Sequence, residues 1–266
     1  MPKQLPLMIM AELRKVLSRP SGWAGPILSV VLPSIVVLGC LIVADKQEAM
    51  QAENPLVAAM INIEPFTAVA WSLKARNFFI MPMVLLLVTA QLFAGERANK
   101  TLRSLLVRPV PRWSVMAAKF SAVTLYAGAC LVITYAMAIV PAVLLFEGET
   151  ELGPVSLGYL ACWLSDAAFI AIAALVCTFT TSVAWAVVGT VIVMMGELAA
   201  RGALEAIEFF GVDWAGTVIA FMPGNALEAW GGFDEEWSIP GFSVLVGMLV
   251  VLGGAALARF QRTDVP

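Results

Sequence analysis

Long stretches without a single charged residue are the feature that most constrains this chain. They cover residues 20–44, 77–95, 120–146 and 237–258, and residues 152–196 are interrupted only by Asp166. A helix needs about 20 mainly apolar residues to cross the hydrocarbon core of a bilayer. The chain is 61% hydrophobic and 13% charged, whereas roughly a quarter of the residues are charged in soluble domains. We therefore predict an integral membrane protein.

The stretch 152–196 is too long for one crossing. Its natural break is a polar cluster, Thr178, Thr180, Thr181 and Ser182. The sequence therefore predicts an all-α membrane protein that forms a single transmembrane domain over residues 1–266. We expect its six transmembrane helices at about 22–44, 77–95, 114–146, 155–178, 183–201 and 238–258. An even number of crossings places both termini on the same side.

The positions of the basic residues give an independent prediction of orientation. Twelve of the 16 Lys and Arg residues fall before the first span, between the second and third, or after the last. Lys and Arg are enriched in cytoplasmic loops. The pattern predicts a multi-pass protein of the inner (plasma) membrane with both termini cytoplasmic. The four remaining basic residues, on the opposite side, are Lys46, Lys74, Arg76 and Arg201.

Three further segments are expected to lie at the membrane surface or to enter it partway. Residues 5–19 place apolar and charged side chains on different faces of one helix, which is typical of an interfacial amphipathic helix; the alternative is a frayed cytoplasmic tail. Residues 45–75 contain two prolines and no complete span, so we expect a surface-lying loop with some helix. Residues 205–232 contain a short apolar stretch broken at Pro223, which favours a re-entrant hairpin.

Histidine is absent from the chain, which excludes bis-histidine haem sites, HExxH metalloproteases and serine-histidine proteases. The cysteines all lie in apolar runs and form no CxxC pair, so we interpret them as buried thiols. No metal site is expected. The four cysteines are Cys40, Cys130, Cys162 and Cys177.

The segment 96–112, which links the second and third spans, carries the strongest functional signal. Three leucines at helical spacing, edged by two arginines, predict a short amphipathic helix that could dock in a groove on another protein. Pro109 would end this helix. A lipid-contact role for the arginines is the alternative, but it does not explain the leucine spacing. The leucines and arginines are Leu102, Leu105, Leu106, Arg103 and Arg108.

These residues resemble the signature of permease subunits of ATP-binding-cassette (ABC) transporters, in the type-2 exporter branch. Asn99-Lys100 is a departure, because the family often has a glycine directly before the threonine. The resemblance extends over nearly the whole chain, through the amino-terminal helix, the six spans and the re-entrant pair. The matching positions are Gly95-Glu96-Arg97, Thr101-Leu102, Leu105-Leu106, Pro109-Val110, Arg112 and Lys119.

The resemblance implies a coupling helix that touches a cytoplasmic ATPase subunit. It further implies two such ATPases, a second permease copy or paralogue, and export of lipidic, amphiphilic or peptide-like cargo. ATP and magnesium would be bound by the ATPase and no cofactor by this chain, which we expect not to be an enzyme. Membrane lipid is a further partner, and nucleic acid is not expected. The implied coupling residues are Glu96, Arg97, Thr101, Leu102, Arg103, Leu105, Leu106, Arg108, Pro109 and Arg112.

Residues 95–101 also read G-x-x-x-x-K-T, but a phosphate-binding loop needs a second glycine before the lysine and a preceding strand. We therefore expect no ATP site here.

Two ionisable residues inside spans are candidates for a polar pathway, because charges there are costly. Glu197 can pair with Arg201 one helical turn away. Asp166 has no basic residue within one turn of its own helix, so it would line a polar pathway or reach water near an interface.

Two other functions are alternatives for this chain. A non-transporting membrane anchor for an ATPase, acting in assembly, motility or maturation, would use the same segment. An ion-driven secondary transporter would need an internal repeat with paired broken helices and several intramembrane charges.

Overall fold

The computed structural model describes residues 4–53, 65–78, 80–99, 111–146, 152–228 and 239–262. Regular structure in this part of the chain is entirely helical. The helices are α1 (Gln4–Leu17), α2 (Pro20–Glu53), α4 (Pro65–Asn77), α5 (Ile80–Ala98), α7 (Arg112–Leu145), α8 (Leu152–Cys177), α9 (Val183–Phe209), α10 (Asp213–Ala220), α11 (Pro223–Leu227) and α12 (Ile239–Arg262).

Six of these helices are long and apolar enough to cross a membrane, which confirms the expected all-α membrane fold. Among the candidate spans, the largest difference from the expected bounds is in α9, which continues to Phe209 rather than ending near residue 201. The candidate spans are Pro20–Lys46, Ile80–Ala98, Arg112–Leu145, Gly153–Cys177, Val183–Phe209 and Phe242–Arg262.

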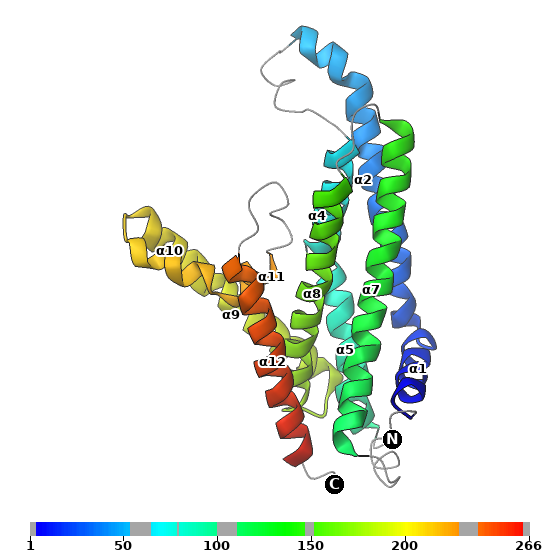
Figure 1. The fold of residues 1–266 in the computed structure, drawn as a ribbon, viewed down its shortest axis with the longest axis vertical. Coiled ribbons are helices and arrows are strands. Elements are labelled where there is room, and N and C mark those ends of the chain that lie inside the picture. Colours follow the sequence, from blue (N-terminus) through cyan, green and yellow to red (C-terminus); the bar gives the residue numbers. More distant parts are fainter. Residues whose placement is uncertain are drawn as a thin grey trace.

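The long helices form an upright bundle of α2, α4, α5, α7 and α8, with α12 packed against α8 (Figure 1). Helix α9 leans away from this bundle, so that α10 at its far end lies to one side. Helix α1 and the carboxyl end of α12 lie at the same end of the bundle, as an even number of crossings requires. We call this end, where α5 ends and α7 begins, the coupling end.

The expectation of a surface-lying loop over residues 45–75 is wrong for its second half. Residues 65–77 form α4, which packs inside the bundle against α2, α7 and α8. Small side chains make this possible, because Ala68 and Ser72 are fully buried and let the helix backbones approach closely. Residues 45–53 continue α2, and residues 54–64 lie outside the described part of the chain.

Buried apolar side chains of the described residues form three clusters, and the two larger ones, which we call the inner and outer cores, follow one another along the bundle. The third and smallest joins α8, α11 and α12. The inner core, near the coupling end, is built on α5 and includes residues of α7, α8 and α12. The outer core is built on α4, with residues of α2, α7 and α8. The break between α4 and α5 therefore coincides with the division between the two cores.

The expected re-entrant segment consists of the end of α9 and two short helices. Gly211, with φ of 86°, closes the turn into α10, a conformation that favours glycine. Helix α10 packs against α9, and α11 packs against α8, α9 and α12. Residues 229–232 of the expected hairpin lie outside the described residues.

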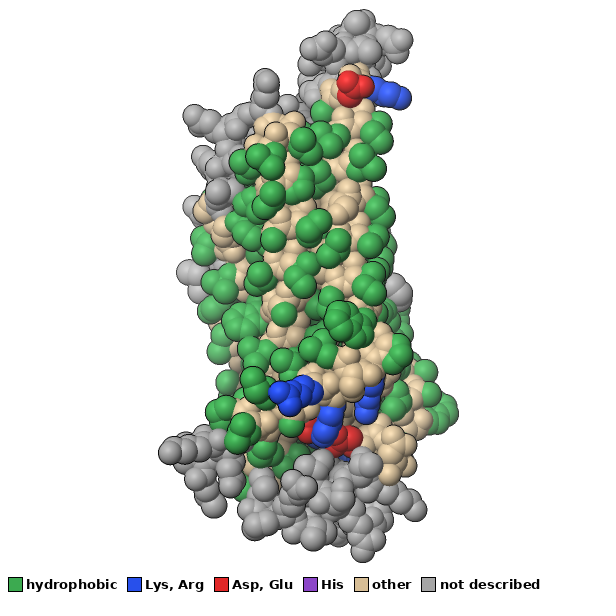
Figure 2. Space-filling model, turned by 90° about the vertical axis from the view of Figure 1, so that its right-hand side faces the viewer, with side chains coloured by type: hydrophobic (Ala, Val, Ile, Leu, Met, Phe, Trp, Pro, Cys, Tyr) green, Lys and Arg blue, Asp and Glu red, His purple; other side chains and the backbone are tan. Residues whose placement is uncertain are grey.

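Apolar side chains cover most of the face that carries α1, whereas charged side chains gather in a band near the coupling end (Figure 2). This band includes residues of α1, whose Leu7 and Met10 are exposed beside it. An apolar surface ended by a charged band is the pattern expected where a bilayer meets water.

Candidate functional site

The structure describes the two ends of the segment 96–112 but not its middle. Glu96 and Arg97 lie in the last turn of α5, and Arg112 begins α7. The remaining predicted coupling residues fall at positions 100–110, outside the described residues, and stay predictions. They are Thr101, Leu102, Arg103, Leu105, Leu106, Arg108 and Pro109.

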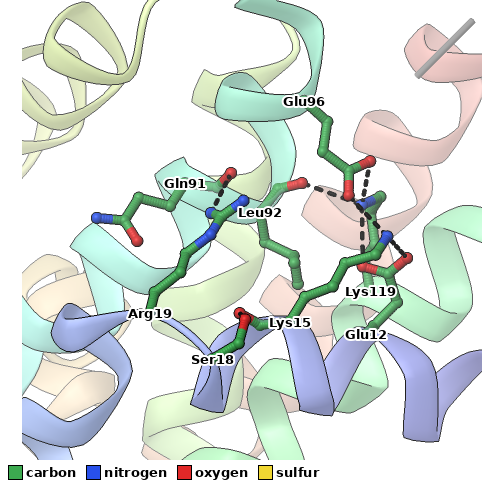
Figure 3. A network of polar contacts seen from close by, with 8 residues as sticks. All are labelled: Glu12, Lys15, Ser18, Arg19, Gln91, Leu92, Glu96 and Lys119. Carbon is green, nitrogen blue, oxygen red and sulfur yellow. Dashed lines mark hydrogen bonds and ion pairs between the residues drawn. The ribbon is translucent and has the colours of Figure 1, made fainter. Parts of the chain in front are cut away.

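Four charged side chains from three helices meet at the coupling end and form what we call the charge network (Figure 3). They are Glu12 and Lys15 of α1, Glu96 of α5 and Lys119 of α7. Lys15 Nζ lies 2.7 Å from Glu12 Oε1 and 2.9 Å from Glu96 Oε1. Lys119 Nζ lies 2.7 Å from Glu96 Oε2 and 3.2 Å from Glu12 Oε2. Each charge thus has two partners of opposite sign.

The charge network is largely buried and electrically balanced. The side chain of Lys119 is 1% exposed and that of Lys15 is 37% exposed. Lys119 also donates a hydrogen bond to the carbonyl of Leu92 at 3.0 Å. Buried charges are tolerated when they are paired and hydrogen-bonded. The network therefore holds α1 against α5 and α7.

The ionisation of Lys15 reflects this pairing. Burial lowers the pKa of its ammonium, but hydrogen bonds to Glu12 and Glu96 outweigh burial and leave the pKa above its ordinary value. Because hydrogen bonding to the charged form favours that form, Lys15 is charged at neutral pH. The stabilisation that Lys15 gives to the network is therefore complete at pH values below its usual pKa. It would be lost only as the pH rises through the raised pKa.

Sequence reasoning assigned Glu96 to contact with an ATPase, but its carboxylate points into the charge network. The geometry instead supports a positioning role, in which Glu96 fixes the end of α5 from which the segment departs. The other three members were not predicted as site residues. Lys119 is one of the positions that match the permease signature, but the sequence analysis gave it no role of its own.

Further contacts reinforce the junction of α1, α2 and α5. Arg19 donates to the carbonyl of Gln91 at 3.2 Å, and Ser21 Oγ donates to Gln91 Oε1 at 2.6 Å. Within α1 itself, the charged Glu12 is buried against the bundle, whereas Leu7 and Met10 are exposed. The described part of α1 is a helix docked on the bundle rather than a frayed tail.

Arg97 and Arg112, at the two ends of the segment 96–112, contact residues at the ends of α8 and α12. Arg97 donates to the carbonyl of Thr178 at 3.0 Å and to that of Cys177 at 3.4 Å, and its guanidinium lies 5.7 Å from the centroid of the Phe260 ring. Arg112 donates to the carbonyl of Gln261 at 3.0 Å. The segment is thereby held between the turn after α8 and the end of α12.

The contact of Arg97 has a clear electrostatic basis. The last four carbonyls of a helix have no intrahelical donor, and a cation near that end is stabilised by the helix dipole. Arg97 supplies both donors and charge to the end of α8. A similar cation–aromatic contact joins Arg259 of α12 to Phe179, at 3.8 Å from the ring centroid.

The structure gives both intramembrane carboxylates partners that the sequence did not reveal. Asp166 Oδ2 lies 2.7 Å from Arg76 Nη2, so the expected solitary carboxylate is half of a buried ion pair between α8 and α4. Glu197 accepts a hydrogen bond from the backbone N–H of Gly224 at 2.9 Å.

The expected pairing of Glu197 with Arg201 is replaced by other contacts. Arg201 Nη1 lies 2.8 Å from Glu228 Oε2, and its Nε lies 3.6 Å from Glu205. Glu197 and Arg201 therefore each tie α9 to the segment around α11, rather than to each other.

The described cysteines are buried and free, as predicted. Cys162 differs from a purely apolar thiol, because its sulfur accepts hydrogen bonds from Arg76 and Asn77. Among the described residues, no three His, Cys, Asp or Glu side chains are grouped as metal ligands.

Comparison with known proteins agrees with the resemblance seen in the sequence. No curated protein matches the chain. A family model described as ABC-2 family transporter protein matches residues 8–197, which is more than half of the chain. The match includes most of α1, the charge network and both ends of the segment 96–112. This chain therefore belongs to the ABC-2 transporter family and is a membrane permease of an ABC transporter.

Proposed function

We propose that this permease couples ATP hydrolysis by a separate cytoplasmic ATPase subunit to the export of substrate across the membrane. The observation that carries the proposal is that both ends of the segment 96–112 are fastened to the bundle. Glu96 lies in the charge network, and Arg97 and Arg112 contact the opposite side of the coupling end. A force applied to a segment held in this way is transmitted to several helices rather than absorbed by local movement.

The contacts define which helices would respond. The charge network joins α5 to α1 and α7, whereas Arg97 and Arg112 join the segment to the end of α8 and to α12. ATP-driven closure of the ATPase would press on the leucine-bearing helix predicted around 100–107. The second and third spans, α5 and α7, which carry its two ends, would tilt together and change the pathway between two permeases.

The remaining parts of the proposal follow from the family and the distribution of charge. We place the coupling end in the cytoplasm of a cell with this protein in its inner (plasma) membrane, because basic residues gather there. A second permease copy or paralogue would complete the pathway, and two ATPase subunits would bind ATP and magnesium. Glu96 acts in this scheme as a positioning residue rather than as a contact with the ATPase.

The proposal can be tested by co-purifying the permease with its ATPase and measuring ATP hydrolysis in liposomes. Leu105→Asp should abolish co-purification, because it places a charge on the apolar docking face. Phe210→Asp is the matched control, since it makes the same type of change at an exposed position in the turn between α9 and α10. Normal co-purification of the Leu105→Asp variant would contradict the proposal.

A second measurement distinguishes export from anchoring. The proposed exporter should hydrolyse ATP faster when a transported amphiphile is added to the liposomes. An anchor that does not transport would bind the ATPase equally well, but would show no stimulation by any amphiphile and no movement of labelled amphiphile across the bilayer.

A further inference from the structure

The second crossing of the bundle is made by two helices rather than one. Helix α4 ends at Asn77 and α5 begins at Ile80. Together they cover residues 65–98, the same length of chain as α2 and α7, which contain 34 residues each and are continuous. The second crossing is therefore as long as its neighbours but interrupted partway.

Proline explains part of this interruption. Inside a helix, the ring of Pro82 would clash with the carbonyl of Phe78, four residues earlier, whereas a proline in the first turn is tolerated. Helix α5 begins so that Pro82 falls in its first turn. Proline alone is not sufficient, because Pro33 and Pro141 lie inside the continuous helices α2 and α7.

A buried polar cluster lies at the end of α4. The guanidinium of Arg76 is fully buried and forms two contacts with Asp166 of α8, at 2.7 Å and 3.4 Å. Arg76 also donates to Cys162 Sγ at 3.2 Å, and the amide of Asn77 donates to the same sulfur at 3.0 Å. These contacts attach the last turn of α4 to one face of α8.

The same level of the bundle separates the two apolar cores. On α8, the outer core ends with Cys162 and the inner core begins with Phe169, so Asp166 lies between them. Helix α4 contributes only to the outer core and α5 only to the inner core. No apolar cluster of the described residues therefore joins α4 to α5.

We propose that α4 and α5 move as separate bodies during the transport cycle, with the Arg76–Asp166 pair as the anchor that keeps α4 fixed on α8. This inference rests on the proposed function, because it takes the motion of α5 from the segment 96–112. Helix α5 changes direction with the coupling end while α4 stays in place. The pair suits a fixed point, because separating two charges within the membrane leaves each one unpaired in a medium of low dielectric constant.

Hydrogen–deuterium exchange of the permease–ATPase complex in nanodiscs tests this inference. ATP with vanadate should change the exchange of amides at the start of α5 by about tenfold or more, because local opening sets exchange rates. Amides within α4 should change less than twofold. Equal changes in α4 and α5, or none in either, would overturn the proposal.

Two proline variants refine the measurement. Pro82→Ala should make the crossing more continuous, slow exchange at the start of α5 in the permease alone, and reduce the response to ATP. Pro141→Ala is the control, because that proline lies inside a continuous helix. An unchanged ATP response in Pro82→Ala would count against separate movement of α4 and α5.

Charge reversal tests the anchor itself. Asp166→Asn should speed exchange throughout α4 by about tenfold or more, and the double variant Arg76→Asp with Asp166→Arg should restore it. If the single variant does not fold, recovery of folding by the double variant supports the pairing, and lack of recovery refutes the anchor.

Failure of this inference can be distinguished from failure of the proposed function. The wild-type permease must first co-purify with the ATPase and support ATP hydrolysis, which tests the proposed function alone. Loss of that binding refutes the proposed function. Intact binding with concerted movement of α4 and α5 refutes only the separate movement, and rapid exchange at the start of α5 can be measured without the ATPase.

Discussion

Two sets of buried charges hold this bundle together, and they differ in how many partners of opposite charge each member has. The charge network at the coupling end has four members, two of each sign, and Lys15 is partly exposed to solvent. The Arg76–Asp166 pair has two members and both are buried. Loss of one network member leaves the others partly compensated, whereas loss of either member of the pair leaves an unpaired charge. Because its members stay partly compensated, the network suits a junction between helices that move. The pair suits a junction between helices that stay fixed.

The largest expected effect comes from breaking the pair. Asp166→Ala should destabilise the protein by roughly 3–5 kcal/mol, because the Arg76 guanidinium is left buried without its carboxylate. Thermal unfolding of the detergent-solubilised permease measures this loss. The double variant Arg76→Met with Asp166→Leu should be less destabilised than either single change. If the loss of stability in the double variant equalled the sum of the losses in the two single variants, the two charges would not depend on each other.

Removing one cation from the network should have a smaller effect. Lys119→Met should cost about 1.5–3 kcal/mol, because Glu12 and Glu96 each lose one charged partner but keep Lys15. Thermal unfolding again provides the measurement. The double variant Lys119→Met with Glu96→Gln balances the remaining charges and should recover part of the loss. A loss as large as that of Asp166→Ala would contradict the contrast between the two sets.

Arg97 should affect coupling more than stability. Arg97→Ala removes donors from the carbonyls at the end of α8 and should cost about 1 kcal/mol, while lowering ATP hydrolysis by the complex several-fold. ATPase assays in liposomes, with binding of the ATPase measured in parallel, check this. Arg97→Lys keeps the charge without the planar donor group and should be intermediate. Full activity in Arg97→Ala would remove this arginine from the coupling path.

The smallest effect is expected at the pair of Arg201 with Glu228, because the Glu228 carboxylate is 62% exposed. Surface ion pairs contribute about 0–1 kcal/mol, so Glu228→Gln should barely change the unfolding temperature. It should also leave ATP hydrolysis unchanged, because α11 and the far end of α9 lie away from the coupling end (Figure 1). A large loss in either measurement would show that the re-entrant region has a part in coupling.

Local composition was sufficient to predict the crossings but not the packing. The length of an apolar run depends only on one continuous stretch of the chain, so the six spans could be predicted from the sequence. Helix α4 was missed because Ser72, Lys74 and Arg76 lower its mean hydropathy, although two of these three side chains are buried. The cost of burying Arg76 is offset by Asp166, 90 residues away in the chain, and a sequence read in order does not reveal such a partner.

The candidate site shows the same limit. The positions of Glu96 and Arg97 were predicted, but the direction in which Glu96 points was not, because it depends on Lys15 and Lys119 from two other helices. Charge in the segment 96–112 was interpreted as a docking surface. In the described part of that segment, it instead fastens the ends to the bundle.

Photo-crosslinking from position 105 tests the central claim most directly. With a benzoylphenylalanine in place of Leu105, irradiation of the reconstituted complex should join the permease to its ATPase subunit. The same substitution at Phe210, in the turn beyond α9, should give no such product. Absence of the crosslink at 105 in a complex that hydrolyses ATP, or equal crosslinking from both positions, would contradict coupling through the segment 96–112.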